Sequence, residues 1–153
     1  MSTDRRITAA GLSVTPPPGW EASIYRRPPG PGEVTYPVVH AATVPLPPSR
    51  ADYGGGLVET LGPDDLFVGF LEFGPEAAGT MLFGRIQGVP GLTPGEYRPR
   101  QLQRTIRGQA GVQRFFTVAG RAFCLYSVIG SVANRVALTA RANQLIGSFR
   151  VER

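Results

Sequence analysis

Few side chains in this 153-residue chain could do chemistry. Its only histidine is His40 and its only cysteine is Cys124. A serine or cysteine hydrolase needs a positioned imidazole as its base, so any such mechanism would have to use His40. No Gly-x-Ser-x-Gly turn is present to supply the nucleophile. Because His40 lies in the apolar run 38–44, we expect a strand histidine held by a neighbour.

The remaining candidate groups also favour structural roles. Cys124 lies between two large apolar residues, and a buried thiol behaves as a small hydrophobe, whereas a reactive thiolate needs polar or cationic surroundings. The adjacent Asp64 and Asp65 follow a Gly-Pro pair, as is typical of a turn that begins a strand. Their spacing does not match a calcium-binding EF-hand loop. We therefore expect no catalytic residue, no metal and no cofactor.

Lysine is absent, so all sixteen basic residues are arginine. A Walker P-loop, a protein-kinase site and a Schiff-base mechanism each require a lysine amine. These three classes are excluded, and the chain is predicted not to be an enzyme.

Composition indicates one globular domain spanning residues 1–153. The twenty glycines and fifteen prolines separate short apolar runs, which favours strands over long helices. No apolar stretch approaches the roughly 18–20 residues that a bilayer span needs. The mildly apolar segment after Arg5-Arg6 is too short for a secretory signal, and a single cysteine agrees with a reducing compartment. We expect a cytoplasmic protein.

The apolar pattern predicts an α+β fold that is mainly antiparallel sheet, with a C-terminal helix packed on one face. We expect strands at 7–14, 20–26, 34–46, 64–73, 101–106, 112–118 and 121–129. Pro37 predicts that its strand lies at an edge or carries a bulge. The last two strands should form a hairpin at Ala119-Gly120, and 121–129, apolar on both faces, should lie inside the sheet.

Helices are expected at three places. A short helix at 52–61 would contain three consecutive glycines, and 75–83 could form one helical turn. Ser131 is expected to cap a final helix at 132–146. Its apolar stripe, which should pack on the sheet, comprises Leu138, Ala142, Leu145 and Phe149.

Charge is distributed unevenly along the chain. Residues 1–96 contain six arginines and ten acids, whereas 97–151 contain nine arginines and no acid. These arginines either pair with acids of the first half or form a basic surface for an acidic partner: a protein, a nucleic acid or a second copy. The candidate partner-binding residues are Arg98, Arg100, Arg104, Arg107 and Arg114.

A protein partner is the favoured interpretation of this basic region. If residues 100–106 form a strand, Leu102 and Ile106 share a face with Arg100 and Arg104. Such a mixture suits protein recognition better than phosphate tracking, and no RNP, KH or zinc-finger pattern is present. A nucleic-acid-binding protein that uses 97–151 remains the alternative.

Three short motifs together resemble a known fold group. They are Gly11-Leu-Ser-Val14 followed by Pro18-Gly-Trp20, the segment Gly120-Arg-Ala-Phe-Cys-Leu-Tyr126, and the ending Leu145-Ile-Gly-Ser-Phe-Arg-Val151. Their order resembles the PsbP-like fold, shared by the photosystem extrinsic protein PsbP, the Ran-binding protein Mog, actinobacterial lipoproteins and chaperones of type VI secretion effectors. Unlike the lipoproteins, this chain has no lipobox cysteine. The resemblance implies a curved antiparallel sheet flanked by helices, an α/β/α sandwich, and a tendency toward non-enzymatic binding. We therefore predict a non-enzymatic protein-binding module: an adaptor, a chaperone or a subunit of a larger assembly.

Overall fold

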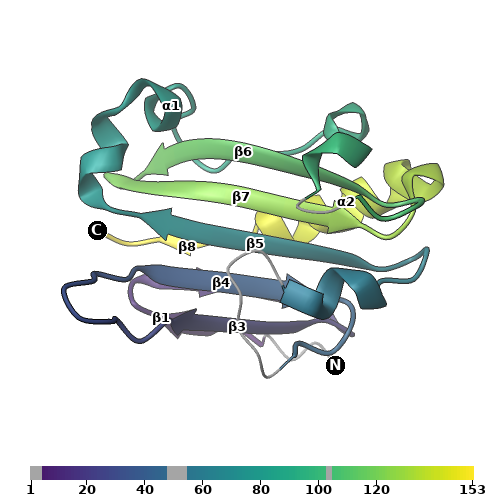
Figure 1. The fold of residues 1–153 in the computed structure, drawn as a ribbon, viewed down its shortest axis with the longest axis horizontal. Coiled ribbons are helices and arrows are strands. Elements are labelled where there is room, and N and C mark those ends of the chain that lie inside the picture. The colour runs from purple at the N-terminus through teal and green to yellow at the C-terminus, as the bar shows by residue number, and fades with distance from the viewer. Residues whose placement is uncertain (1–4, 48–54, 103–104) are drawn as a thin grey trace.

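The chain folds around two antiparallel sheets (Figure 1). The computed structural model describes residues 5–47, 55–102 and 105–153. The larger sheet has the strand order β3-β4-β5-β7-β6 and the smaller one the order β1-β2-β8. The strands are β1 (Ile7–Ala9), β2 (Leu12–Val14), β3 (Glu21–Arg26), β4 (Pro37–Ala42), β5 (Leu66–Phe73), β6 (Ala110–Val118), β7 (Arg121–Ile129) and β8 (Arg150–Val151). The predicted α+β class with antiparallel strands is confirmed.

Helical segments lie on both faces of the larger sheet. The longest, α2 (Arg135–Ile146), lies behind it in Figure 1, and the 3₁₀ helix η1 (Gly55–Thr60) lies in front. The short helices η2 (Pro75–Gly79) and α1 (Met81–Gly84) follow β5, and η5 (Val132–Asn134) leads into α2. The 3₁₀ turns η3 (Pro94–Glu96) and η4 (Pro99–Gln101) precede β6.

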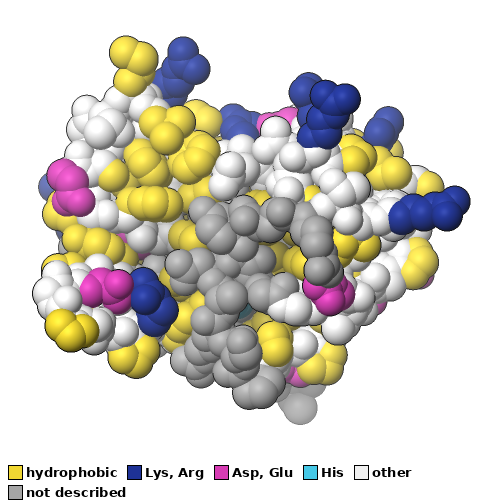
Figure 2. Space-filling model, in the orientation of Figure 1, with side chains coloured by type: hydrophobic (Ala, Val, Ile, Leu, Met, Phe, Trp, Pro, Cys, Tyr) yellow, Lys and Arg dark blue, Asp and Glu magenta, His cyan; other side chains and the backbone are white. Residues whose placement is uncertain are grey.

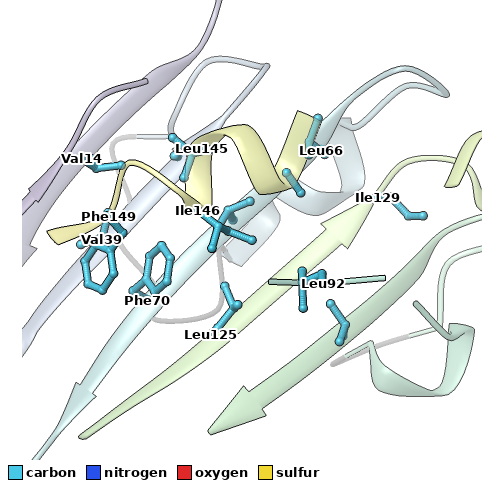
Figure 3. Packing of buried hydrophobic residues seen from close by; sticks show 14 of the residues in the cluster. Val14, Val39, Leu66, Phe70, Leu92, Leu125, Ile129, Leu145, Ile146 and Phe149 are labelled. Atoms are coloured by element: carbon cyan, nitrogen blue, oxygen red, sulfur yellow. The ribbon is translucent and has the colours of Figure 1, made fainter. Parts of the chain in front are cut away.

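Aromatic rings seal the face of the sheet that α2 covers. Phe149, just beyond α2, is 1% exposed and stacks on Phe70 of β5, with ring centroids 3.9 Å apart. It also meets Phe123 of β7 edge-to-face at 5.5 Å. Leu145 and Ile146 of α2 belong to the same buried cluster, and Figure 3 shows Ile146 between the helix and the strands. The packing of the C-terminal segment on the sheet is thus as predicted.

The opposite face has its own apolar layer. Phe67 of β5 and Tyr126 of β7 pack there with Leu57 of η1 and with Leu61. Because both faces are covered, every residue from Ala122 to Ile129 is buried, and β7 lies between β5 and β6. The predicted interior position of 121–129 is confirmed.

Two tight hairpins use the same dipeptide. The predicted turn at Ala119-Gly120 has φ values of 52° and 75°, and pairs Val118 with Arg121. The expected strand 7–14 is wrong, because Ala10 and Gly11, with φ of 54° and 76°, fold it into the β1–β2 hairpin. Two consecutive positive φ angles give the turn geometry that matches strand twist.

The prediction for Pro37 is also wrong. β4 is an interior strand between β3 and β5, and it pairs regularly with both. Pro37 is its first residue, opposite Arg26. A proline at the start of a strand is tolerated although it has no N–H to donate, so it does not force the strand to an edge.

The strand expected at 101–106 is not formed. Pro99 begins the 3₁₀ turn η4, and Gly108, with φ of 83°, turns the chain into β6; residues 103–104 lie outside the described chain. The argument that Leu102 and Ile106 share a strand face with Arg100 and Arg104 therefore fails. The helix expected at 52–61 is the shorter η1, with 52–54 outside the described residues.

The final helix begins later than predicted and ends where predicted, at Ile146. Residues 132–134 form a 3₁₀ turn and the α-helix begins at Arg135. Ser131 makes no side-chain capping bond. Phe149 is buried with the predicted stripe but lies after the helix ends at Ile146.

Candidate functional site

Arg121 is occupied inside the fold. Its guanidinium donates to both carboxylate oxygens of Glu72, at 2.9 and 2.5 Å. It also donates to the backbone carbonyls of Ala10 and Glu152, at 3.0 and 2.9 Å. The hydrogen bond to Glu72 raises the pKa of Arg121 above its ordinary value. Arg121 therefore joins β7 to β5, to the β1–β2 turn and to the C-terminus.

Arg114, one of the five candidate partner-binding residues, is also engaged. Its side chain is half-buried and forms an ion pair with Glu96 of η3. Arg141 donates to the carbonyl of Asp64 at 2.7 Å, and Arg150 donates to the nearby carbonyls of Gly147 and Phe149. Pairing with acids of the first half thus accounts for Arg114 and Arg121.

Arg98, Arg100 and Arg107 differ from this paired group. All three are exposed, and none has a side-chain hydrogen bond or ion pair with any part of the chain that the structure describes. Arg98 precedes η4, Arg100 lies within it, and Arg107 lies just before β6. Arg104, the fifth candidate, lies outside the described residues. Figure 2 shows basic side chains projecting along the upper border of the molecule, which is the β6 side in Figure 1, and at the right-hand border.

β6 is an edge strand whose outer side is bonded at both ends. At one end Arg98 and Gly111 exchange backbone hydrogen bonds of 2.8 and 2.9 Å. At the other end the Thr117 N–H donates to the Ile86 carbonyl at 2.9 Å, and the Gly88 N–H donates to the Thr117 carbonyl at 2.8 Å. Between these ends, in a stretch of about 20 Å, lie Gln113 and Phe115.

The backbone groups of Gln113 and Phe115 face outward. Alternate residues of an antiparallel strand direct their N–H and C=O groups to opposite sides, so these two share the outward direction of Gly111 and Thr117. No backbone group among the described residues bonds to them. A short open segment of strand edge therefore lies between η4 and α1.

An apolar surface flanks the α1 end of this opening. Met81 and Leu82 of α1 are 81% and 54% exposed. Phe83 beside them turns inward and contacts the rings of Phe73 and Phe115, with centroids 5.1 and 5.3 Å apart. The yellow area at the upper left of Figure 2 includes this part of the surface.

We define the β6 edge surface as the open backbone of Gln113 and Phe115, the exposed arginines Arg98 and Arg100, and the exposed apolar residues Met81 and Leu82. The sequence prediction found the arginines but missed the apolar end. A signal was present, since three consecutive large apolar residues on one short helical turn cannot all face the same core.

The side chains examined for chemistry have structural surroundings. His40 is buried between the rings of Tyr25 and Phe67, at centroid distances of 5.2 and 5.1 Å. Burial raises the pKa of the Cys124 thiol to about 12. The carboxylate of Asp65 accepts from the Thr43 hydroxyl and the Gly62 N–H, both at 2.9 Å. Within 5–47, 55–102 and 105–153, no three metal-ligating side chains of His, Cys, Asp or Glu come together.

A cleft of about 400 Å³ lies between the end of α2 and residues 89–91. Apolar groups including Val118, Ile146 and Phe149 line most of it. Its polar side chains already bond backbone groups: Asn143 with Leu92 at 2.9 and 2.8 Å, and Arg150 with nearby carbonyls. The cleft lacks the convergent polar groups that orient a small molecule.

No family model matches the chain, and neither a curated protein nor a solved structure is significantly similar to it. In the described part of the chain, no helix combines the length and apolar character needed to cross a bilayer.

Proposed function

We propose that this protein is a non-enzymatic protein-binding module that holds its partner at the β6 edge surface. The observation that carries the proposal is the open backbone of Gln113 and Phe115 between unpaired arginines and exposed apolar residues. A partner segment lying along β6 would bond this backbone, as in recognition by β-strand addition. Acidic side chains of the partner would meet Arg98 and Arg100, and apolar ones would meet Met81 and Leu82.

The exposed apolar residues favour a protein over a nucleic acid. In the described chain, the large apolar side chains classed as exposed are Val34, Met81, Leu82 and Val136, all aliphatic. Surfaces that hold single-stranded nucleic acid usually stack bases on exposed aromatic rings. Arginine beside methionine and leucine instead matches the composition of protein interfaces. Nucleic-acid binding through 97–151 is the second candidate, supported by the absence of acids in that region.

The resemblance to the PsbP-like fold supports the same proposal. Helical segments on both faces of an antiparallel sheet are compatible with an α/β/α sandwich, and that fold group consists mostly of non-enzymatic binders. We further propose a cytoplasmic adaptor, chaperone or assembly subunit, which agrees with a lone cysteine that is buried.

Site-specific photo-cross-linking in the source cells tests the proposal. A photoreactive residue at Leu82, 54% exposed on α1, should cross-link to one partner protein. The same residue at Val136, 72% exposed on α2, is the matched control and should not. Arg98→Glu with Arg100→Glu should reduce the Leu82 product by roughly tenfold or more, because reversed charges at an interface repel the partner.

A second double variant controls for net charge. Arg135→Glu with Arg153→Glu changes two exposed arginines that lie neither on β6 nor on the segments bound to its edge. It alters net charge by the same amount and should leave the Leu82 product unchanged. An equal loss of the Leu82 product in both double variants would show that net charge, and not Arg98 and Arg100 in particular, controls partner binding. A Leu82 product that contains nucleic acid would shift the function to the second candidate.

A further inference from the structure

β3 forms the opposite edge of the larger sheet. Which of its backbone groups point away from the sheet can be worked out from a hydrogen bond between the end of β4 and β5. The Thr43 N–H donates to the Leu66 carbonyl at 3.1 Å, so the alternate residues of β4, Val39 and Ala41, bond to β5. The others bond to β3, where their partners are Glu21, Ser23 and Tyr25. The backbone N–H and C=O groups that point away from the sheet are therefore those of Ala22, Ile24 and Arg26.

In the described part of the chain, no backbone group bonds to the outward groups of Ala22, Ile24 or Arg26. The edge ends at Trp20, whose carbonyl accepts a hydrogen bond from the Arg5 guanidinium. Within the described residues, the β3 edge differs from that of β6 in having no outward backbone hydrogen bond from Ala22 to Arg26. Proteins usually cover, shorten or pair such an edge.

We propose that a second copy of this chain pairs with this edge, β3 against antiparallel β3, about a twofold axis through Ile24. A twofold axis perpendicular to the sheet keeps each face on the same side, so only residues of the same parity can lie opposite each other. The register that uses all three outward residues places Ile24 opposite Ile24 of the second copy and Ala22 opposite Arg26 of the second copy.

Charge selects the same register. With Ile24 on the axis, Glu21 lies opposite Arg27 of the second copy, in a non-hydrogen-bonded pair where side chains are closest. Shifting the axis by one residue in either direction places Glu21 opposite Tyr25, or outside the paired segment. The Glu21 carboxylate uses one oxygen for the Leu46 N–H, at 3.2 Å. The side chain of Arg27 is 53% exposed, and only its Nη1 bonds Glu33, at 3.1 Å; both ions therefore retain free groups.

Light scattering across a concentration series tests the dimer. The wild-type chain should shift from 16.4 kDa toward twice that mass. Glu21→Arg or Arg27→Glu alone would place two like-charge pairs in each dimer and should raise the dissociation constant about tenfold or more. The double variant restores both pairs and should recover dimerisation. Glu33→Gln, which removes the ion pair of Arg27 within its own chain and keeps an oxygen that can accept from the Gly30 N–H, should leave the dimer intact.

Cysteine cross-linking checks the register without altering charge. In Ile24→Cys the two thiols would face each other across Cα atoms about 5.5 Å apart, within reach of a short bifunctional maleimide. In Ala22→Cys, on the same edge and face, they would be separated by four residues along the strands, about 13 Å or more. Efficient cross-linking of Ile24→Cys, together with little cross-linking of Ala22→Cys, would support the proposal. A chain that stays monomeric, equal cross-linking at both positions, or a double charge variant that fails to dimerise would overturn it, whatever the outcome at the β6 edge surface.

Discussion

Replacing Phe149 by alanine should remove a large part of the stability of this protein. The ring is 1% exposed, stacks on Phe70 at 3.9 Å and meets Phe123 at 5.5 Å. Truncating a buried phenylalanine costs about 3–5 kcal/mol, because transfer energy is lost and a cavity remains. For a chain of this size that corresponds to a fall of about 6–20 °C in Tm. Urea unfolding, followed through the fluorescence of the buried Trp20, measures the change.

Two further variants separate ring contacts from burial. Phe149→Leu keeps most of the apolar volume but loses both ring pairs, each contributing about 0.5–1.5 kcal/mol, so we expect a loss of about 1–3 kcal/mol. Val136→Ala, at a residue 72% exposed on α2, should change stability by less than about 0.5 kcal/mol. A cooperative Phe149→Ala variant that loses under about 1 kcal/mol would refute the view that residues beyond α2 seal the sheet.

Three other predictions concern stability and reactivity. Arg121→Met should lower the free energy of unfolding in urea by about 2–4 kcal/mol, because the Glu72 side chain, which is 9% exposed, loses its cation. Adding Glu72→Gln to Arg121→Met should recover part of this loss. Unchanged stability of the Arg121→Met variant would contradict the prediction. Gly130→Ala would place its Cβ 1.8 Å from the Gly62 carbonyl oxygen and should lower the stability by about 3 kcal/mol or more. Gly79→Ala, whose Cβ would have no atom within 4 Å, should leave the stability nearly unchanged. Similar melting temperatures of the two variants would contradict the close approach of Gly130 to Gly62. Because burial raises the pKa of Cys124 from about 9 to about 12, the folded state holds the thiol proton more tightly, and stability should fall as pH rises between these values, by up to about 1.4 kcal/mol per pH unit. Cys124→Ala should flatten this slope, and an unchanged slope would refute the assignment.

The interior of the sheet was predictable because its signal is local. Both faces of strand 121–129 are mainly apolar, and only an interior strand buries both faces. The apolar spacing of Leu138, Ala142 and Leu145 likewise indicated which side of α2 packs on the sheet. Phe149 was assigned to that helical stripe, but the chain leaves the helix at Gly147, and its burial depends on contacts with distant strands.

The hairpins show where local signals become ambiguous. Ala10-Gly11 and Ala119-Gly120 adopt nearly the same positive φ angles. The second turn was predicted because it lies between two long expected strands, 112–118 and 121–129, whereas the first lies between strands of three residues. Such short strands look like one continuous strand until the pairing of Ile7 with Val14 is known.

The candidate site was only partly predictable because charge pairing is non-local. Arg121 and Glu72 are 49 residues apart, and Arg114 and Glu96 are 18 apart. No spacing rule distinguishes these paired arginines from the unpaired Arg98 and Arg100. The open backbone of β6 was equally invisible, since it depends on where residues 86–88 and Arg98 return to the strand edge.

Amide hydrogen exchange on β6 tests the central proposal most directly. In the free protein the N–H groups of Gln113 and Phe115 face outward and should exchange quickly, whereas those of Arg114 and Phe116, directed to β7, should be protected. When the partner cross-linked at Leu82 is bound, the Gln113 and Phe115 amides should become protected, and Arg98→Glu with Arg100→Glu should prevent the change. Exchange at these two amides that stays fast in a saturated complex would show that the partner binds elsewhere and would contradict recognition at the β6 edge surface.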